Sequence, residues 1–275
     1  MGRPVNPPLR RALGHWRAPV CVLAAAAALL FYVPFLVVVA TSWTGGEFVL
    51  FPPQGFSLRW YASVLGDPEW AQAFRTSLWT SAVATAVAVV IGTLGALALS
   101  RLRSRTGRRL LRTLFIVPIA IPPVAYGAGL YLVNIGSEPL YGTFVLFVLG
   151  EAVLGAPYVF VLVANRLEQT DPTLHPAAAT LGASWPMILW RVDLPLVLPS
   201  VLRGTLFAFV VIFDEVVLSV FLVPVGGRTL PLQMLGASQE AFSPQLTAAS
   251  TLVSVVAVAA LALFGLAARI RKDPP

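Results

Sequence analysis

Long stretches without any charged residue constrain this chain more than any other feature of its sequence. Four such windows hold 25 to 29 uncharged residues each, and they lie between Arg17 and Glu47, Arg75 and Arg101, Arg112 and Glu138, and Glu240 and Arg269. A helix needs about 20 mainly apolar residues to cross about 30 Å of hydrocarbon. Charged residues make up only 11% of the chain, against about 25% in soluble domains. The sequence therefore predicts an integral membrane protein and excludes the soluble, disordered and disulfide-scaffold classes.

Two more apolar segments are long enough to span the membrane but contain acids. Residues 140–164 include Glu151, and residues 196–223 include Asp214 and Glu215. Acids inside spans are rare, and they occur where the side chain faces the protein interior or water. With these two segments, the predicted fold class is an all-α membrane protein with six transmembrane helices.

The arginines set the expected orientation. Six arginines between Arg101 and Arg112, those of the N-terminal arm and those of the C-terminal tail fall on one side of a six-span topology. The positive-inside rule makes this side cytoplasmic, so both termini are expected in the cytoplasm. The arginines could instead form a patch for nucleic acid or acidic lipid, but topology alone accounts for them. We expect a lipid bilayer and no nucleic acid as a partner.

These observations divide the chain into five parts. The first apolar segment is too long for a signal peptide and is expected to remain as an anchor. The outer connection after it is rich in glycine and proline, which favours turns over a folded domain. The expected parts are a cytoplasmic arm (1–17), a first transmembrane helix (18–43), an external loop (44–71), a core of five transmembrane helices (72–268) with a long cytoplasmic loop (165–194), and a cytoplasmic tail (269–275).

The usual residues of enzymes and nucleotide-binding proteins are missing from the sequence. It contains no G-x-x-x-x-G-K-[ST] phosphate loop, and its only lysine is Lys272, so ATP is not bound by that route. One cysteine, Cys21, and two histidines, His15 and His175, provide neither a metal cluster nor a nucleophile arrangement. We expect no enzyme activity, no metal and no cofactor on this chain. Any work driven by ATP would come from a separate subunit.

The cytoplasmic loop before the fifth span predicts a helix-turn-helix at the membrane surface. Residues 177–181 favour one short helix, Gly182 suits its C-terminal turn, and Ser184 can cap a second helix with Pro186 in its first turn. Small side chains on this loop would allow the backbone of a partner to approach closely. An interfacial hairpin that packs only on its own bundle is the alternative.

At these residues the sequence resembles the permease subunits of binding-protein-dependent ABC importers. Their cytoplasmic EAA loop is matched by Ala177-Ala178, Gly182 and Leu194-Pro195, while the glutamate of the family falls on Pro176. The departure removes a charge from the loop, and it is compatible with a helix that starts at Pro176 with His175 as its cap. The residues that the resemblance places in contact with an ATPase are Ala177, Ala178, Leu181, Gly182, Ala183 and Ser184.

A narrower resemblance, to the second permease of spermidine/putrescine importers, covers about residues 71–268. It rests on the segment from Phe213 to Val217, on Thr229-Leu230-Pro231, on Pro157-Tyr158 and on the prolines at 118, 122 and 123. It implies the type I ABC importer permease fold, a pore formed with a second, different permease chain, a cytoplasmic ABC ATPase dimer that holds ATP and Mg²⁺, and an extracytoplasmic solute-binding protein.

The three intramembrane acids predict a path for a cation. On a continuous fifth helix, Glu151 and Asp214 would both lie about 13 to 15 Å below the outer surface, and Asp214 and Glu215 would point about 100° apart. No Lys or Arg lies in the outer half of a span, so the acids must be protonated or paired with an incoming cation. Tyr126, Tyr131 and Phe213 could line the path by cation-π contact. Which of Asp214 and Glu215 faces the path stays open.

Three interpretations of function follow. The first is a permease subunit of an ATP-driven importer for a small cationic solute such as a polyamine. The second is a proton-coupled secondary transporter that uses the acids as a relay, although no internal repeat typical of such carriers is visible. The third is a membrane scaffold that transports nothing, which needs no intramembrane acids and leaves them unexplained.

Overall fold

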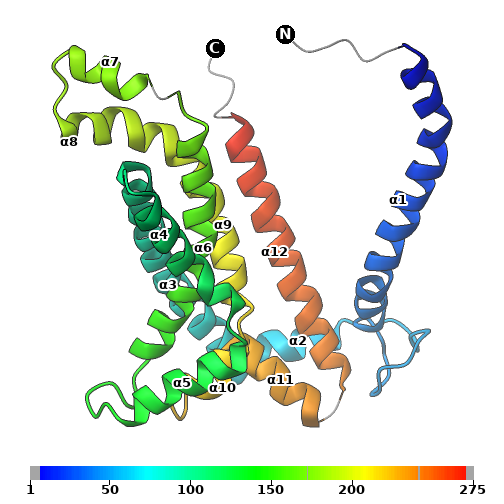
Figure 1. Ribbon diagram of the computed structural model, residues 1–275. Coiled ribbons are helices and arrows are strands. Elements are labelled where there is room, and N and C mark those ends of the chain that lie inside the picture. The colour runs from blue at the N-terminus through cyan, green and yellow to red at the C-terminus, as the bar shows by residue number, and fades with distance from the viewer. Residues whose placement is uncertain (1–6, 172, 241, 271–275) are drawn as a thin grey trace. The chain divides into compact units, whose positions relative to one another are not determined.

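The computed structural model describes residues 7–171, 173–240 and 242–270, and the regular elements within them are all helices, without a β-strand (Figure 1). The ends of the predicted cytoplasmic arm and tail, residues 1–6 and 271–275, lie outside this range. The elements are α1 (Pro7–Thr41), α2 (Arg59–Gly66), α3 (Pro68–Arg101), α4 (Arg105–Ala120), α5 (Pro123–Ile135), α6 (Val145–Glu168), α7 (Leu174–Thr180), α8 (Trp185–Ile188), the π-helical turn η1 (Leu189–Asp193), α9 (Leu194–Phe213), α10 (Val217–Leu222), α11 (Leu230–Glu240) and α12 (Pro244–Ile270).

Two compact units divide the chain. The core unit is Pro68–Gly236, and the second unit combines Met1–Asp67 with Ala237–Pro275. In the second unit α12 packs on α1 and α2. There the hydroxyls of Ser42 and Tyr61 are 2.6 Å apart, and Gln245 donates to Ser63 over 3.0 Å.

Three helices, α3, α6 and α9, form the centre of the core unit and pack closely because glycines lie between them. A Cβ on Gly92 would lie 2.8 Å from the carbonyl oxygen of Ala156, and a Cβ on Gly204 would lie 2.8 Å from the Cα of Val159. Small residues at such crossings let backbones approach, which is a main source of helix association in lipid. The three helices therefore form a tightly packed frame to which the shorter elements attach.

The third predicted span is not one helix. It is broken into α4 and α5, whose axes meet at 100°. Proline explains the break: Ile121 precedes Pro122 and is extended, with ψ of 130°, as the residue before a proline prefers. Pro123 then begins α5. A backbone N–H at this position would have no acceptor within the helix, so the missing N–H of proline costs no hydrogen bond.

The fifth predicted span is also interrupted, so the expectation of one helix over 196–223 is wrong. α9 ends at Phe213, and α10 begins at Val217. The Oε1 atom of Glu215 accepts hydrogen bonds from the amides of Val217 (2.8 Å) and Leu218 (3.2 Å). These amides belong to the first turn of α10 and have no helical acceptor, so the glutamate stabilises a new helix start inside the predicted span.

Within the described residues, four helices are long and apolar enough to cross a membrane, and up to five if α4 and α5 count as one broken span. The four are Pro19–Thr41, Pro68–Arg101, Val145–Glu168 and Trp185–Phe213. α12 covers the sixth predicted window, and its stretch Pro244–Ala259 is apolar but shorter than a full span. The predicted external loop also differs, because it contains α2 and ends where α3 begins at Pro68.

Candidate functional site

The surface hairpin, which consists of α7, the turn at Gly182, α8 and η1, lies at one end of the core unit, while α5 and α10 lie at the other (Figure 1). It starts earlier than predicted: the cap is Thr173, not His175. Oδ1 of Asp171 accepts hydrogen bonds from the Thr173 amide (2.9 Å) and hydroxyl (2.7 Å). They hold the pKa of Asp171 below its ordinary range, because they favour the ionised carboxylate.

The turn of the hairpin follows the prediction closely. Gly182 has φ of +82° and ends α7. The amide of Ala183 donates to the Ala178 carbonyl and the amide of Gly182 to the Ala179 carbonyl, both over 3.0 Å, which is the Schellman motif that favours glycine. Ser184 is extended ahead of α8 but makes no side-chain cap bond, and Pro186 lies in the first turn.

Large apolar side chains of the hairpin are exposed. Leu181 is 88% exposed, Trp190 69% and Trp185 58%. Of the residues predicted to contact an ATPase, Ala177, Leu181, Gly182 and Ser184 are exposed, while Ala178 and Ala183 are half-buried. An exposed apolar surface of this kind marks an interaction site or a membrane contact.

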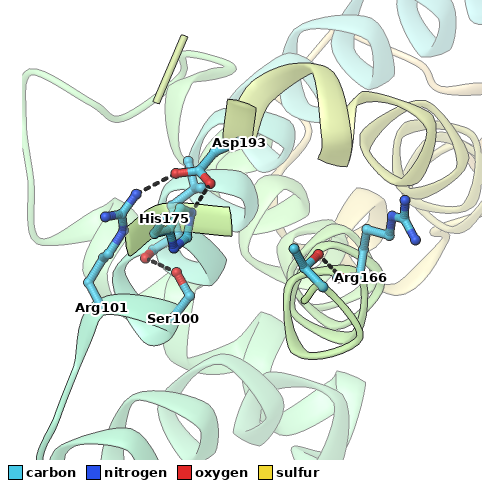
Figure 2. Close-up of polar contacts among 7 residues, drawn as sticks. Ser100, Arg101, Arg166, His175 and Asp193 are labelled. Carbon is cyan, nitrogen blue, oxygen red and sulfur yellow. Dashed lines mark hydrogen bonds and ion pairs between the residues drawn. The ribbon is translucent and has the colours of Figure 1, made fainter. Parts of the chain in front are cut away.

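A buried acid holds the hairpin to the core unit. Asp193, at the end of η1, is 1% exposed, and its two carboxylate oxygens face an arginine and a histidine (Figure 2). Its Oδ2 pairs with the Arg101 guanidinium at the end of α3, and its Oδ1 lies 2.6 Å from Nε2 of His175 on α7. The Arg101 guanidinium also lies 5.9 Å from the ring centroid of Trp185 on α8. We call Arg101, His175 and Asp193 the Asp193 clamp.

The sequence did not predict this cluster. Arg101 was counted only for topology, and His175 was expected to cap a helix. The signal that could have found it is Asp193 itself, a lone acid between Val192 and Leu194 where a surface helix turns into a span. An acid at such a junction must find a partner if it is buried.

The second cluster lies where α5, α6 and α10 pack together. Glu151 on α6 is 2% exposed, and its Oε2 has no hydrogen-bond partner among the residues described. Glu215 lies close enough for its charge to act on Glu151. The Tyr126 hydroxyl donates to the carbonyl of Gly150, one residue before Glu151, over 3.2 Å. The structure thus gathers Glu151, Glu215 and Tyr126.

Asp214 and Phe213 lie at the break beside this cluster. Asp214 follows the last residue of α9 and its side chain is exposed, while Phe213 is half-buried and stacks on Phe209 at 5.6 Å. The expected 100° separation of Asp214 and Glu215 on one helix is wrong, because neither residue is inside a helix. Of the two, it is Glu215 whose charge acts on Glu151. Tyr131, the remaining aromatic candidate, is exposed.

Several known proteins are similar to this chain, among them three transport permeases and a transporter of known structure. The chain is 27% identical over 248 residues to the putrescine transport system permease protein PotI of Escherichia coli K12, covering 88% of each chain. It is 31% identical to the spermidine/putrescine permease PotC of Haemophilus influenzae, covering 86% of this chain and 91% of that one. It is also 31% identical to the molybdenum permease ModB of Mycobacterium bovis, covering 82% of this chain and 90% of that one.

A bacterial ABC transporter that imports alginate has a chain with the same fold. The TM-score is 0.74 at 13% sequence identity, and the match covers 98% of this chain and 100% of that one. Residues 88–272 match the family described as "Binding-protein-dependent transport system inner membrane component". The chain therefore belongs to this family of inner-membrane ABC importer permeases, and it is a transport subunit, not an enzyme.

Proposed function

We propose that this permease forms half of the translocation pathway of an ATP-driven importer for a small cationic solute, a polyamine such as putrescine or spermidine. The observation that carries the proposal is the buried carboxylate of Glu151, which has an unpartnered oxygen and a second acid, Glu215, nearby.

The acids Glu151 and Glu215 favour a cationic solute. A carboxylate in hydrocarbon costs several kcal/mol unless it is neutralised or paired. No Lys, Arg or His within the described residues forms an ion pair with Glu151 or Glu215. A diamine could place an ammonium group between the two acids. Tyr126, Phe213 and Asp214 would line its route with an aromatic face and one more acid.

The related proteins support a polyamine only in part. PotI and PotC are named for putrescine and spermidine, but ModB, at the same identity as PotC, is named for molybdenum. Similarity to these permeases therefore does not establish whether the solute of this chain is a cation or an anion. The acids of this chain favour a cation.

We further propose a topology of six spans with both termini in the cytoplasm. The four long apolar helices support it, with α4 and α5 taken as one broken span and α12 as the sixth. On this topology the surface hairpin lies on the arginine-rich, cytoplasmic side, and the acids lie toward the outer end of the bundle.

The partners follow from the hairpin and the family. The exposed residues Leu181, Trp185 and Trp190 would dock on a cytoplasmic ATPase dimer, with Ala177, Ala178, Gly182, Ala183 and Ser184 allowing close approach. That dimer would hold ATP and Mg²⁺. An extracytoplasmic binding protein would deliver the solute, and a second, different permease chain would complete the pathway. Membership of an ABC importer family argues against the proton-coupled alternative.

Reconstitution tests the proposal. Proteoliposomes that contain the complete transporter should accumulate labelled putrescine only when ATP is present on the cytoplasmic side of the transporter, in the lumen, and the binding protein is present in the outer solution. Molybdate and an uncharged diol of the same chain length serve as competitors and should not reduce uptake. Uptake driven by a proton gradient without ATP, or accumulation of molybdate in place of putrescine, would contradict the proposal.

A further inference from the structure

We propose that the Asp193 clamp is the joint that transmits movement of the surface hairpin into the transmembrane helices, and that Arg101 and His175 are positioning residues for transport. This proposal rests on the proposed function as an ATP-driven importer. It concerns residues that lie away from the acid cluster, and Trp185 is the exposed hairpin residue that lies beside them, with its ring 5.9 Å from the Arg101 guanidinium.

The Asp193 clamp joins both helices of the hairpin to one point. His175 lies on α7, Trp185 on α8 and Asp193 at the end of η1, and all three interact through Asp193 or Arg101. Ile188 of α8 is buried as well, so the hairpin also packs through an apolar side chain. Three side-chain links to a single arginine and a single aspartate make it move as one body.

Arg101 connects the clamp to the central helices. It is the last residue of α3, which packs on α6 at Gly92 and also on α9. A displacement of Asp193 is therefore transmitted through Arg101 to the central helices α3, α6 and α9. Of these helices, α6 carries Glu151.

The geometry of Asp193 is fixed by its partners. Both carboxylate oxygens have a partner, and the side chain is 1% exposed. Buried charge pairs are held in a narrow range of geometries because each partner loses much by leaving the other. The carboxylate also ends a π-helical turn, a feature that often marks functional sites in helices. This combination suits a joint better than a flexible hinge.

Uptake and ATP hydrolysis measured together in proteoliposomes test the joint. In the complete transporter, Arg101→Gln should lower putrescine uptake per ATP hydrolysed by about tenfold, a typical coupling between sites, while the ATPase still co-purifies with the permease. Arg101→Lys should give an intermediate loss, because lysine keeps the charge but not the planar fork. Arg103→Gln is the matched control, since Arg103 is exposed and has no partner among the residues described.

A double-mutant cycle separates the joint from general damage. If Arg101 and Asp193 act as a unit, Arg101→Gln combined with Asp193→Asn should lose no more coupling than either change alone. Hydrogen exchange on the detergent-solubilised permease should show faster exchange over 174–193 in each variant and unchanged exchange in α6.

The outcomes distinguish the two proposals. A wild-type transporter that does not import putrescine with ATP overturns the proposed function. An active wild-type transporter in which Arg101→Gln keeps its uptake per ATP, or in which uptake falls only as far as the ATPase dissociates, overturns the joint.

Discussion

Two buried acids of the core unit, Asp193 and Glu151, differ in how the protein satisfies them. Their exposed fractions are nearly equal, at 1% and 2%. Asp193 has a partner on each oxygen, from an arginine and a histidine of two other elements. Glu151 has an oxygen without a partner among the described residues and a second acid close by.

The difference separates an acid that holds two elements together from an acid that is left to meet a ligand. A buried charge that is fully paired stabilises one arrangement of the helices, whereas a buried charge without a partner is retained at a cost. Such a cost is common at sites that bind a ligand, because the ligand supplies what the protein lacks. The predictions below test this contrast.

The largest change in stability is expected at the paired acid. Asp193→Asn should lower the free energy of unfolding by about 1–3 kcal/mol. This is less than the roughly 3–5 kcal/mol of a fully buried pair, because water reaches part of Arg101. Thermal unfolding of the purified permease in detergent measures it. A melting temperature equal to that of the wild type would mean that the clamp contributes nothing to the fold.

The unpaired acid should behave in the opposite way. Glu151→Gln keeps the shape of the side chain and replaces a buried carboxyl group that has no cationic partner among the described residues, so the free energy of unfolding should stay equal or rise by up to about 1 kcal/mol. The same unfolding assay without substrate measures it. A loss of stability similar to that of Asp193→Asn would show that Glu151 has a structural partner after all.

A smaller effect on transport is expected at Asp214. Its side chain is exposed at the break between α9 and α10, where water screens its charge. Asp214→Asn should therefore reduce putrescine uptake by only about two- to fivefold, equivalent to about 0.4–1 kcal/mol, with the ATPase still bound. Uptake at the wild-type rate would remove Asp214 from the pathway.

The smallest effect is expected at Asp171, an exposed acid whose partners are uncharged. Asp171→Ala removes two hydrogen bonds to Thr173 and should speed hydrogen exchange in the first turn of α7 only. Because the pKa of Asp171 is lowered from 3.8, its contribution is complete above that pH and is lost as the pH falls through the lower value. Exchange that is unchanged in the variant, or that speeds throughout the hairpin, would contradict this account.

Sequence reasoning predicted the helical segments, since charge-free windows follow directly from the thickness of a bilayer. It also predicted the turn at Gly182, where one residue with positive φ decides the local structure. The breaks were missed. The prolines at 118, 122 and 123 lie in an apolar window that is long enough for a straight span, so length concealed the bend.

The clamp could not be predicted, because it depends on tertiary contacts. Arg101 and Asp193 are 92 positions apart, and His175 and Asp193 are 18 apart. No periodicity links these residues. The break at Glu215 was missed for a related reason: a carboxylate that caps a helix start looks in the sequence like any other acid in an apolar run.

The transport rate of the Glu151→Gln variant tests the central claim most directly. The measurement uses proteoliposomes with the complete transporter, saturating binding protein and ATP, and compares the variant with wild type and with Glu138→Gln, an exposed acid. Glu151→Gln should lower the maximal rate of putrescine uptake by about tenfold or more, equivalent to at least about 1.4 kcal/mol. Glu138→Gln should match the wild type. Equal rates in all three proteins would contradict the claim that Glu151 binds a cationic group of the solute.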